Sequence, residues 1–258
     1  MASMPSRELR DDLGATVRLP RTARSVVCLV PSLTEAVATS RPELLIAATD
    51  WCSHPSDLEV IRVRGTKNPD LKRIIELRPD LVICNQEENR QLDVQRLRAA
   101  GVPVWVTRIE TLTQSLDSMT RLFTEALGGP VPGWLDEARA AWAVPPAGRP
   151  VSVAVAIWRD PWMVVGARTF TGDLLRRLAA RNVFEAAAER YPTVTVPEIV
   201  EAVPELVLLP DEPYRFTAED GPEAFPDTRT ALVSGRLLTW YGPSLVNARA
   251  ELENVLQL

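Results

Sequence analysis

The only histidine of the chain, His54, lies two positions after one of the three cysteines, Cys52, in a segment expected to be a loop. Thiolate and imidazole groups can bind a metal, but a closed zinc site needs four ligands, and no second Cys/His pair exists. No recognised nucleophile motif supports a Ser-His-acid or Cys-His enzyme. The pattern favours a non-metal role in which His54 lines a binding cleft. Axial ligation of a bound haem or corrinoid, and an enzyme that uses Cys52 or His54, remain alternatives.

Large aromatic side chains gather in the expected loops. Four of the seven tryptophans and all three tyrosines fall there. A flat ring with one polar atom suits a broad, mostly apolar ligand with a polar edge, although a single loop aromatic usually only covers the core. The set as a whole favours a binding cleft. Its members are Trp51, Trp158, Trp162, Trp240, Tyr191, Tyr214 and Tyr241.

Short polar segments beside the expected strands add further candidate ligand contacts. Gly65 and Thr66 begin a segment that lacks the spacing of a Walker phosphate loop, so it is either a plain turn or a contact. Asn85 follows an expected buried strand. Glu87 and Glu88 are either a solvated acidic pair or ligand contacts.

The chain repeats itself once, at an offset of 125 positions. Segment 74–83 is similar to segment 199–208, and segment 24–30 is similar to segment 149–155. In the first pair, a helix ends at a proline and an acidic residue precedes a short apolar strand. Two matches at one offset favour a structural duplication over the general alternation of strands and helices in α/β proteins.

Alternating strands and helices are expected in both halves. The residues Ser32 and Glu35 have the spacing of a capping box at the start of a helix. The expected strands are 26–30, 44–48, 81–84, 103–106, 151–157, 163–165 and 206–209. The expected helices are 70–77, 92–100, 112–127, 132–143, 171–180, 197–202 and 243–256. Short strands separated by helices imply mostly parallel sheets with helices on both faces.

This order predicts two α/β lobes, which span residues 1–130 and 147–258, with a connecting helix at 131–146. Two such lobes joined once create a crevice, and ligands of these folds bind beyond the carboxyl ends of the strands. We therefore expect a ligand cleft between the lobes.

Composition excludes several classes of protein. A net charge of −5 argues against a general nucleic-acid binder. No apolar run approaches the roughly 20 residues of a membrane-spanning helix. Three cysteines do not make a disulfide framework. The first eight residues contain no apolar core of signal-peptide length, so we expect a cytoplasmic protein; a chain whose leader had been removed would look the same.

Several segments resemble the class III (helical-backbone) substrate-binding proteins, the iron-siderophore and cobalamin type. They are 11–20, which resembles the family's N-terminal hairpin, 26–35, 71–85 and 98–104. The second half, with Trp158, Arg159 and Trp162 and the run Glu212-Pro213-Tyr214, is most similar to the cobalamin-binding branch. The similarity extends over nearly the whole chain and is most specific in the first 110 residues.

The resemblance implies two Rossmann-like lobes, a helical backbone, and capture of a ligand without chemistry by a monomer with no intrinsic cofactor. The expected ligand is cobalamin or another corrinoid first, and a ferric siderophore or haem next. The cleft aromatics of the family correspond to Trp51, Trp158, Trp162, Tyr191 and Trp240, and its polar contacts to Gly65, Thr66 and segment 85–89. An anionic siderophore would favour arginines, for which Arg64, Arg159 and Arg215 are candidates.

Two departures from the family affect the expected partner. The family is normally exported, and it docks an ABC permease through one glutamate in each lobe. Lys72 and Pro197 occupy those positions here, and a lysine would repel the arginines of a permease. Asp70, Glu76 or Glu198 are possible substitutes. A cytoplasmic carrier or sensor for a corrinoid or haem-like ligand, with no transporter, is therefore the alternative function.

Overall fold

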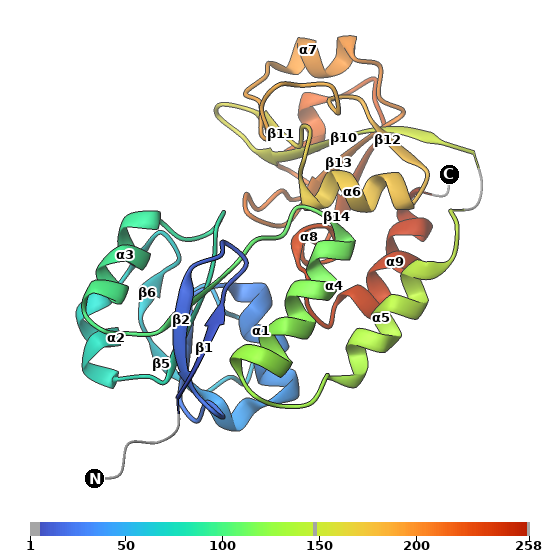
Figure 1. The fold of residues 1–258 in the computed structure, drawn as a ribbon. Helices are drawn as coiled ribbons and strands as arrows, with labels where there is room; N and C mark the ends of the chain where they lie inside the picture. The colour runs from blue at the N-terminus through green and yellow to red at the C-terminus, as the bar shows by residue number, and fades with distance from the viewer. Residues whose placement is uncertain (1–5, 147–148, 257–258) are drawn as a thin grey trace. The chain divides into compact units, whose positions relative to one another are not determined.

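The computed structural model describes residues 6–146 and 149–256, and these form two compact units. The first unit takes in the chain up to Ile109, Thr113–Asp136 and Tyr241–Pro243; the second takes in Glu110–Leu112, Glu137–Trp240 and the chain from Ser244 onward. The expected start of the second lobe at residue 147, and the first five residues, lie outside the described residues. Each unit has its own sheet (Figure 1).

A parallel sheet in the order β5-β4-β3-β8-β9 forms the centre of the first unit. Every residue of β3, β8 and β9 is buried, as expected for strands covered on both faces. An antiparallel hairpin of β1 and β2 precedes the sheet. The strands are β1 (Ser6–Arg10), β2 (Thr16–Pro20), β3 (Val26–Cys28), β4 (Leu45–Ala48), β5 (Ile61–Arg62), β8 (Leu81–Asn85) and β9 (Val104–Thr107), with the short hairpin β6 (Arg64–Gly65) and β7 (Asn68–Pro69).

The helices of the first 146 residues follow the expected positions closely. They are α1 (Pro31–Ser40), α2 (Leu71–Leu77), α3 (Gln91–Ala99), α4 (Leu112–Arg121) and α5 (Gly133–Ala143), with the 3₁₀ turn η1 (Pro42–Leu44) and the π-helical segment η2 (Leu122–Ala126). The single helix expected over 112–127 is thus an α-helix that continues as a π-helix.

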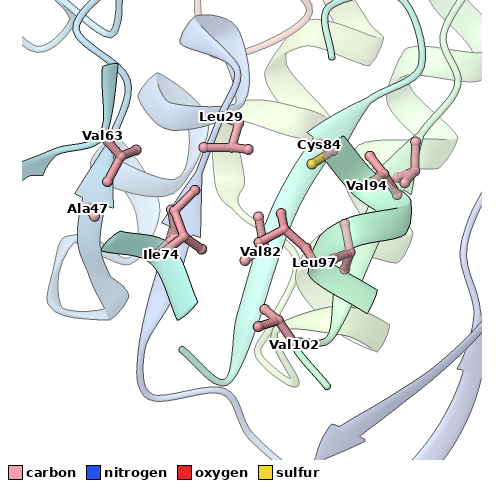
Figure 2. Close-up of a cluster of buried hydrophobic side chains, with 12 residues drawn as sticks. Leu29, Ala47, Val63, Ile74, Val82, Cys84, Val94, Leu97 and Val102 are labelled. Carbon is pink, nitrogen blue, oxygen red and sulfur yellow. The ribbon is translucent and has the colours of Figure 1, made fainter. Parts of the chain in front are cut away.

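Helices α2 and α3 pack on one face of the first sheet and form its hydrophobic core with it (Figure 2). Ile74 of α2 and Val94 and Leu97 of α3 meet Val82 and Cys84 of β8. Val82 and Cys84 are two positions apart, so the pleat directs both side chains to the same face of the sheet.

The second unit is built on a mixed sheet in the order β11-β10-β13-β14, with β12 also paired to β10. Strands β10, β12, β13 and β14 are parallel, and β11 is antiparallel. The strands are β10 (Val151–Trp158), β11 (Met163–Val164), β12 (Ala180–Asn182), β13 (Leu206–Pro210) and β14 (Thr230–Val233). The helices are α6 (Phe170–Arg177), α7 (Val196–Glu201), α8 (Gly235–Thr239) and α9 (Leu245–Leu256), with the 3₁₀ turn η3 (Pro222–Ala224).

The two units repeat one topology. The order β4-β3-β8-β9 of the first sheet is that of β12-β10-β13-β14 in the second. Asp70 caps α2 and Thr195, 125 positions later, caps α7. Arg78 and Val203, which have the same offset, both have positive φ, at 48° and 51°. The duplication expected from the sequence is confirmed at the level of strand order and helix ends.

Some expected local features are wrong. The capping box at Ser32 and Glu35 is absent, because α1 begins at Pro31 with Val30 as its N-cap. Proline is favoured in the first turn, where its missing N–H costs nothing, and this places Ser32 inside the helix. The capping box of the chain is Thr195 with Glu198. Ala180, expected to end a helix, begins β12, and β14 and α8 were not expected at all.

Helices in the described parts of the chain are too short or too polar to cross a membrane.

Candidate functional site

The candidate ligand contacts of each unit lie in loops beyond the carboxyl ends of its parallel strands. In the first sheet, β3 has β4 on one side and β8 on the other, so the chain reverses its direction across the sheet there. Ligands of open α/β sheets bind at such a switch point. The loop after β4 contains Trp51 and His54, β8 ends at Asn85, and the loop after β8 contains Glu87.

The Trp51 indole is the most exposed large ring of the first unit. Its side chain is 69% exposed, and a Cβ added at Gly65 would lie only 3.2 Å from Trp51 Nε1. The same Cβ would lie 2.5 Å from Asn68 Oδ1. Gly65 therefore allows the indole to rest against the backbone of the β6–β7 hairpin, which leaves the rest of the ring available to a ligand.

Arg62 holds the loop that carries Trp51. Its Nη1 donates to the carbonyl oxygens of Thr49 and Cys52, at 3.0 and 2.9 Å, and its Nη2 donates to Leu58 O at 3.1 Å. Sequence analysis did not identify this residue. Its Nη1 acceptors are backbone carbonyl groups 13 and 10 positions earlier in the chain, and a residue of any type offers such a group, so no sequence motif marks this contact.

A network of amide side chains joins the polar segments of the first unit. Asn89 Nδ2 donates to Leu29 O and Thr66 O, at 3.2 and 3.0 Å, and Asn89 Oδ1 accepts from the Asn85 N–H. Asn85 Oδ1 in turn accepts from the N–H of Glu87 at 2.8 Å. Asn85 and Asn89 are buried, so their part is to hold Thr66 and the glutamate pair in place.

Both members of the glutamate pair are half-buried. Lys67 Nζ donates to the Glu87 carbonyl oxygen at 2.5 Å, which ties the β6–β7 turn to the loop after β8. The structure therefore brings Thr66, Asn85, Glu87 and Glu88 together, whereas the sequence offered them only as separate candidate contacts.

Cys52 and His54 do not form a joint site. Cys52 is fully buried, and its sulfur lies 3.0 Å from Thr34 Oγ1 and 3.1 Å from Thr49 Oγ1. Burial raises the pKa of the thiol, which keeps it protonated and a poor nucleophile or metal ligand. His54 is exposed, with Nδ1 3.2 Å from Ser53 Oγ. Within residues 6–146 and 149–256, no three His, Cys, Asp or Glu side chains are grouped to hold a metal.

Aromatic rings of the second unit form a continuous row. Trp158, at the end of β10, is 43% exposed and meets Tyr214 edge to face, with centroids 5.6 Å apart. Tyr214 contacts Phe216 at 4.8 Å, and Phe216 stacks on Trp162 at 5.6 Å. The row ends in the core, where Trp162 meets Phe225. Trp158 is thus the exposed end of a rigid aromatic stack.

Charged groups surround this row. Tyr214 Oη donates to Asp220 Oδ2 at 2.6 Å, and the Arg159 guanidinium is paired with both Asp220 and Glu223. The same guanidinium lies 5.5 Å from the centroid of Trp162. The hydrogen bond to Asp220 raises the pKa of the Tyr214 phenol. Sequence analysis identified neither acid, because they follow Tyr214 in a loop without a motif.

The other aromatic side chains that were expected to contact a ligand are less exposed. Trp162 and Trp240 are 8% and 6% exposed, and Tyr241 is also buried. Trp162 belongs to the core of its unit, so its ring supports Phe216 there. Tyr191 is half-buried beside the Arg190 guanidinium, which lies 5.8 Å from its ring centroid. Burial raises the pKa of Glu212, which lies against Gly235.

No protein-family model matches the chain. The vitamin B12-binding protein of Vibrio parahaemolyticus serotype O3:K6 is 25% identical over 190 residues, which cover 70% of this chain and 69% of that protein. The vitamin B12-binding protein of Pectobacterium atrosepticum is 23% identical over 196 residues, which cover 71% of this chain and 70% of the relative.

Solved structures share the fold. The periplasmic vitamin B12 binding protein BtuF of Vibrio cholerae superposes with a TM-score of 0.74 at 18% identity, over 91% of this chain and 97% of that one. The periplasmic heme-binding protein RhuT from Roseiflexus sp. RS-1 superposes with a TM-score of 0.79 at 19% identity, over 91% and 98% of the two chains. The similarity expected from the sequence is confirmed in both sequence and fold.

Proposed function

We propose that this chain, which has the fold of the class III substrate-binding proteins, captures a large, flat, metal-containing ligand without converting it. Cobalamin or another corrinoid is the first candidate, and haem or a ferric siderophore is the next. The observation that carries the proposal is the similarity to vitamin B12-binding proteins over some 70% of the chain. By this proposal the ligand brings its own metal.

The side chains of both units suit this role. Trp51, in the loop after β4, and Trp158, at the end of β10, each have an exposed indole. A corrin ring is broad and apolar with amide groups at its edge, and indoles pack on such surfaces while their N–H groups remain polar. Thr66, Glu87 and Glu88 add acceptors near Trp51. We propose that these five residues contact the ligand, with His54, Tyr191 and Tyr214 around them.

Burial of the Cys52 thiol argues against the alternative of an enzyme. A nucleophilic cysteine needs a depressed pKa and access to its substrate. Cys52 has a raised pKa and no exposed surface. Its sulfur contacts Thr49 in the loop after β4 and Thr34 in helix α1, and so holds this loop to the helix.

Calorimetric titration tests the proposal directly. The purified chain is titrated with cyanocobalamin, haemin and a ferric catecholate siderophore, and tryptophan fluorescence is followed in parallel. We expect saturable binding of one cyanocobalamin per chain. Absence of saturable binding to all three would overturn the proposed function.

A second candidate function is that of a carrier or sensor without a transporter. Lys72 lies on α2 with its side chain 86% exposed, in the position where the family resemblance places a permease-docking glutamate. Pro197 lies in the first turn of α7 at the equivalent position. Solved structures that share the fold include periplasmic vitamin B12- and heme-binding proteins, so the leading proposal is an extracytoplasmic protein that serves an ABC importer.

Stimulation of a vitamin B12 importer in proteoliposomes separates these two functions. The native chain and a Lys72→Glu, Pro197→Glu double variant are compared, each loaded with cobalamin. If the native chain stimulates ATP hydrolysis, the transporter role is supported. If only the double variant stimulates it, the carrier or sensor role is supported instead.

A further inference from the structure

The loop that covers the aromatic row of the second unit carries an excess of negative charge. Between Asp211 and Glu223 the chain has five acidic residues and one arginine. Two of the acids, Asp220 and Glu223, pair with Arg159. Asp160 Oδ2 lies 3.8 Å from the Nε of the same arginine. Three carboxylates thus share one guanidinium, which leaves a net negative charge beside Trp158.

This charge faces solvent and can act on a ligand. The side chains of Asp160, Asp220 and Glu223 are 88%, 38% and 48% exposed, whereas that of Arg159 is 25% exposed. The guanidinium is thus the less accessible partner, and two carboxylates and the Trp162 ring already occupy its surroundings. A carboxylate of an incoming ligand would have to displace one of them, and would meet like charges as it approached.

The phenol of Tyr214 is also engaged in a hydrogen bond. It donates its proton to Asp220 at 2.6 Å, and as a phenolate it would face a second negative charge at that distance. Ligation of a ferric haem by this oxygen would require loss of the proton and of that hydrogen bond. The geometry therefore gives the second unit a flat indole surface with an acidic rim, in which Arg159 lies among three carboxylates and the Tyr214 phenol is hydrogen-bonded to Asp220; Arg215, the arginine of the same loop, is exposed.

We propose that the acidic rim formed by Asp160, Asp220 and Glu223 around Arg159 determines ligand class: it admits neutral or cationic corrinoids and rejects anionic macrocycles. This inference rests on the proposed function and deepens it. Cyanocobalamin is neutral with amide side chains, aquacobalamin is cationic, and haemin carries two propionates. The rim attracts or tolerates the first two and repels the third.

Neutralising the rim tests the inference. The variants are Asp220→Asn with Glu223→Gln, and separately Asp160→Asn, at a side chain that is 88% exposed. Glu219→Gln, a change at an exposed acid of the same loop, is the matched control. Affinities for cyanocobalamin, aquacobalamin and haemin are measured by calorimetry at low and high salt, with circular dichroism to verify folding.

We expect the native chain to bind cyanocobalamin at least tenfold more tightly than haemin. The double variant should narrow this gap about tenfold, Asp160→Asn should narrow it less, and Glu219→Gln should leave it unchanged. Added salt should narrow the gap in the native chain, because it screens exposed charges. If haemin binds as tightly as cobalamin, or if the gap survives in both rim variants, the inference fails while ligand capture stands. If no corrinoid or haem binds the native chain, both fail.

Discussion

Asp80 and Glu205 lie 125 positions apart and make the same hydrogen bonds in the two units. The Asp80 N–H donates to Ser25 O and Ser25 Oγ, at 2.9 and 3.0 Å, and its carboxylate accepts from the Ser25 N–H. The Glu205 N–H donates to Ser152 O and Ser152 Oγ, at 2.8 and 3.0 Å, and its carboxylate accepts from the Ser152 N–H.

Each of these pairs precedes the first paired residues of two neighbouring strands. Val26 pairs with Leu81, and Val153 pairs with Leu206. The serines are 127 positions apart and the acids 125, so the strand register is the same in both units and the connecting chain is two residues shorter in the second. The match of segment 24–30 to segment 149–155, expected at an offset of 125, is therefore off by two residues.

Acid should weaken the second unit through Glu205. Its partners Arg149 and Ser152 lower the pKa of this carboxyl from 4.5 to about 2. A group with a depressed pKa stabilises the fold above its unfolded value and loses that effect as the pH falls through its folded value. We expect the melting temperature to fall between pH 4.5 and about 2, and to fall less in Glu205→Gln. Glu201→Gln, at an exposed glutamate of α7, should leave the profile unchanged, and thermal melts followed by circular dichroism measure both.

Replacing Val203 should stabilise the protein. This valine has a φ of 51° and is 74% exposed, so its branched side chain gains little packing in return for a strained backbone. We expect Val203→Asn to raise the free energy of unfolding by about 1 kcal/mol, since asparagine tolerates the left-handed region better. Val200→Asn, on the helical part of α7, is the control and should not stabilise. Urea unfolding measures the free energy of unfolding of both variants. A Val203→Asn variant that is no more stable than the native protein would contradict backbone strain at this position.

Replacing Trp51 should lower ligand affinity, whereas replacing Trp162 should lower the stability of the fold. Trp51 is 69% exposed, so Trp51→Ala should leave stability unchanged and weaken cyanocobalamin binding about tenfold or more. Trp162 packs between Phe216 and Phe225, so Trp162→Ala should lower the free energy of unfolding by about 3–5 kcal/mol. Leu92→Ala, at another exposed apolar residue, controls for loss of surface. Calorimetry and urea unfolding give the two quantities, and a large stability loss in Trp51→Ala would contradict this division.

Asn89 should matter to the fold and to the site together. Its side chain connects Leu29, Thr66 and Asn85. Asn89→Leu leaves the carbonyl oxygens of Leu29 and Thr66 and the N–H of Asn85 without this partner, which should cost about 1–3 kcal/mol for each group that stays buried and unsatisfied. We expect lower stability in urea and weaker ligand binding. Gln86→Leu, at an exposed position of the same loop, is the comparison, and equal behaviour of the two variants would show that Asn89 has no organising part.

The three thiols should not react with thiol reagents in the native protein. Cys28, Cys52 and Cys84 are free and buried. Burial raises the pKa of all three, that of Cys84 to about 12. We expect a thiol reagent at pH 8 to label them only after unfolding in guanidinium. If the native protein is labelled fast and this labelling is lost in Cys52→Ser, Cys52 is accessible and reactive, which would contradict the prediction.

The site shows where sequence analysis succeeds and where it fails. Trp51 and Trp158 were expected among the cleft aromatics, and both are exposed at the carboxyl edge of their sheets. Trp162 was expected beside them and packs in the core, because its neighbours Phe216 and Phe225 come from a loop more than 50 residues away. Asp220 and Glu223, which pair with Arg159, lie 61 and 64 residues after it in the chain. The sequence therefore suggested a positively charged site at Arg159, whereas the folded cluster is acidic.

By itself, the sequence determined the alternation of strands and helices, the 125-residue repeat and the loops in which aromatic rings gather. These depend on local pattern: strand burial, proline breaks and helix caps act within a few residues. Tertiary structure alone decided which rings are exposed, that Cys52 is buried between two threonines, and that Asp220 and Glu223 surround Arg159. Those outcomes depend on contacts between segments distant in the chain, whose pairing is set by packing and charge and leaves no local trace.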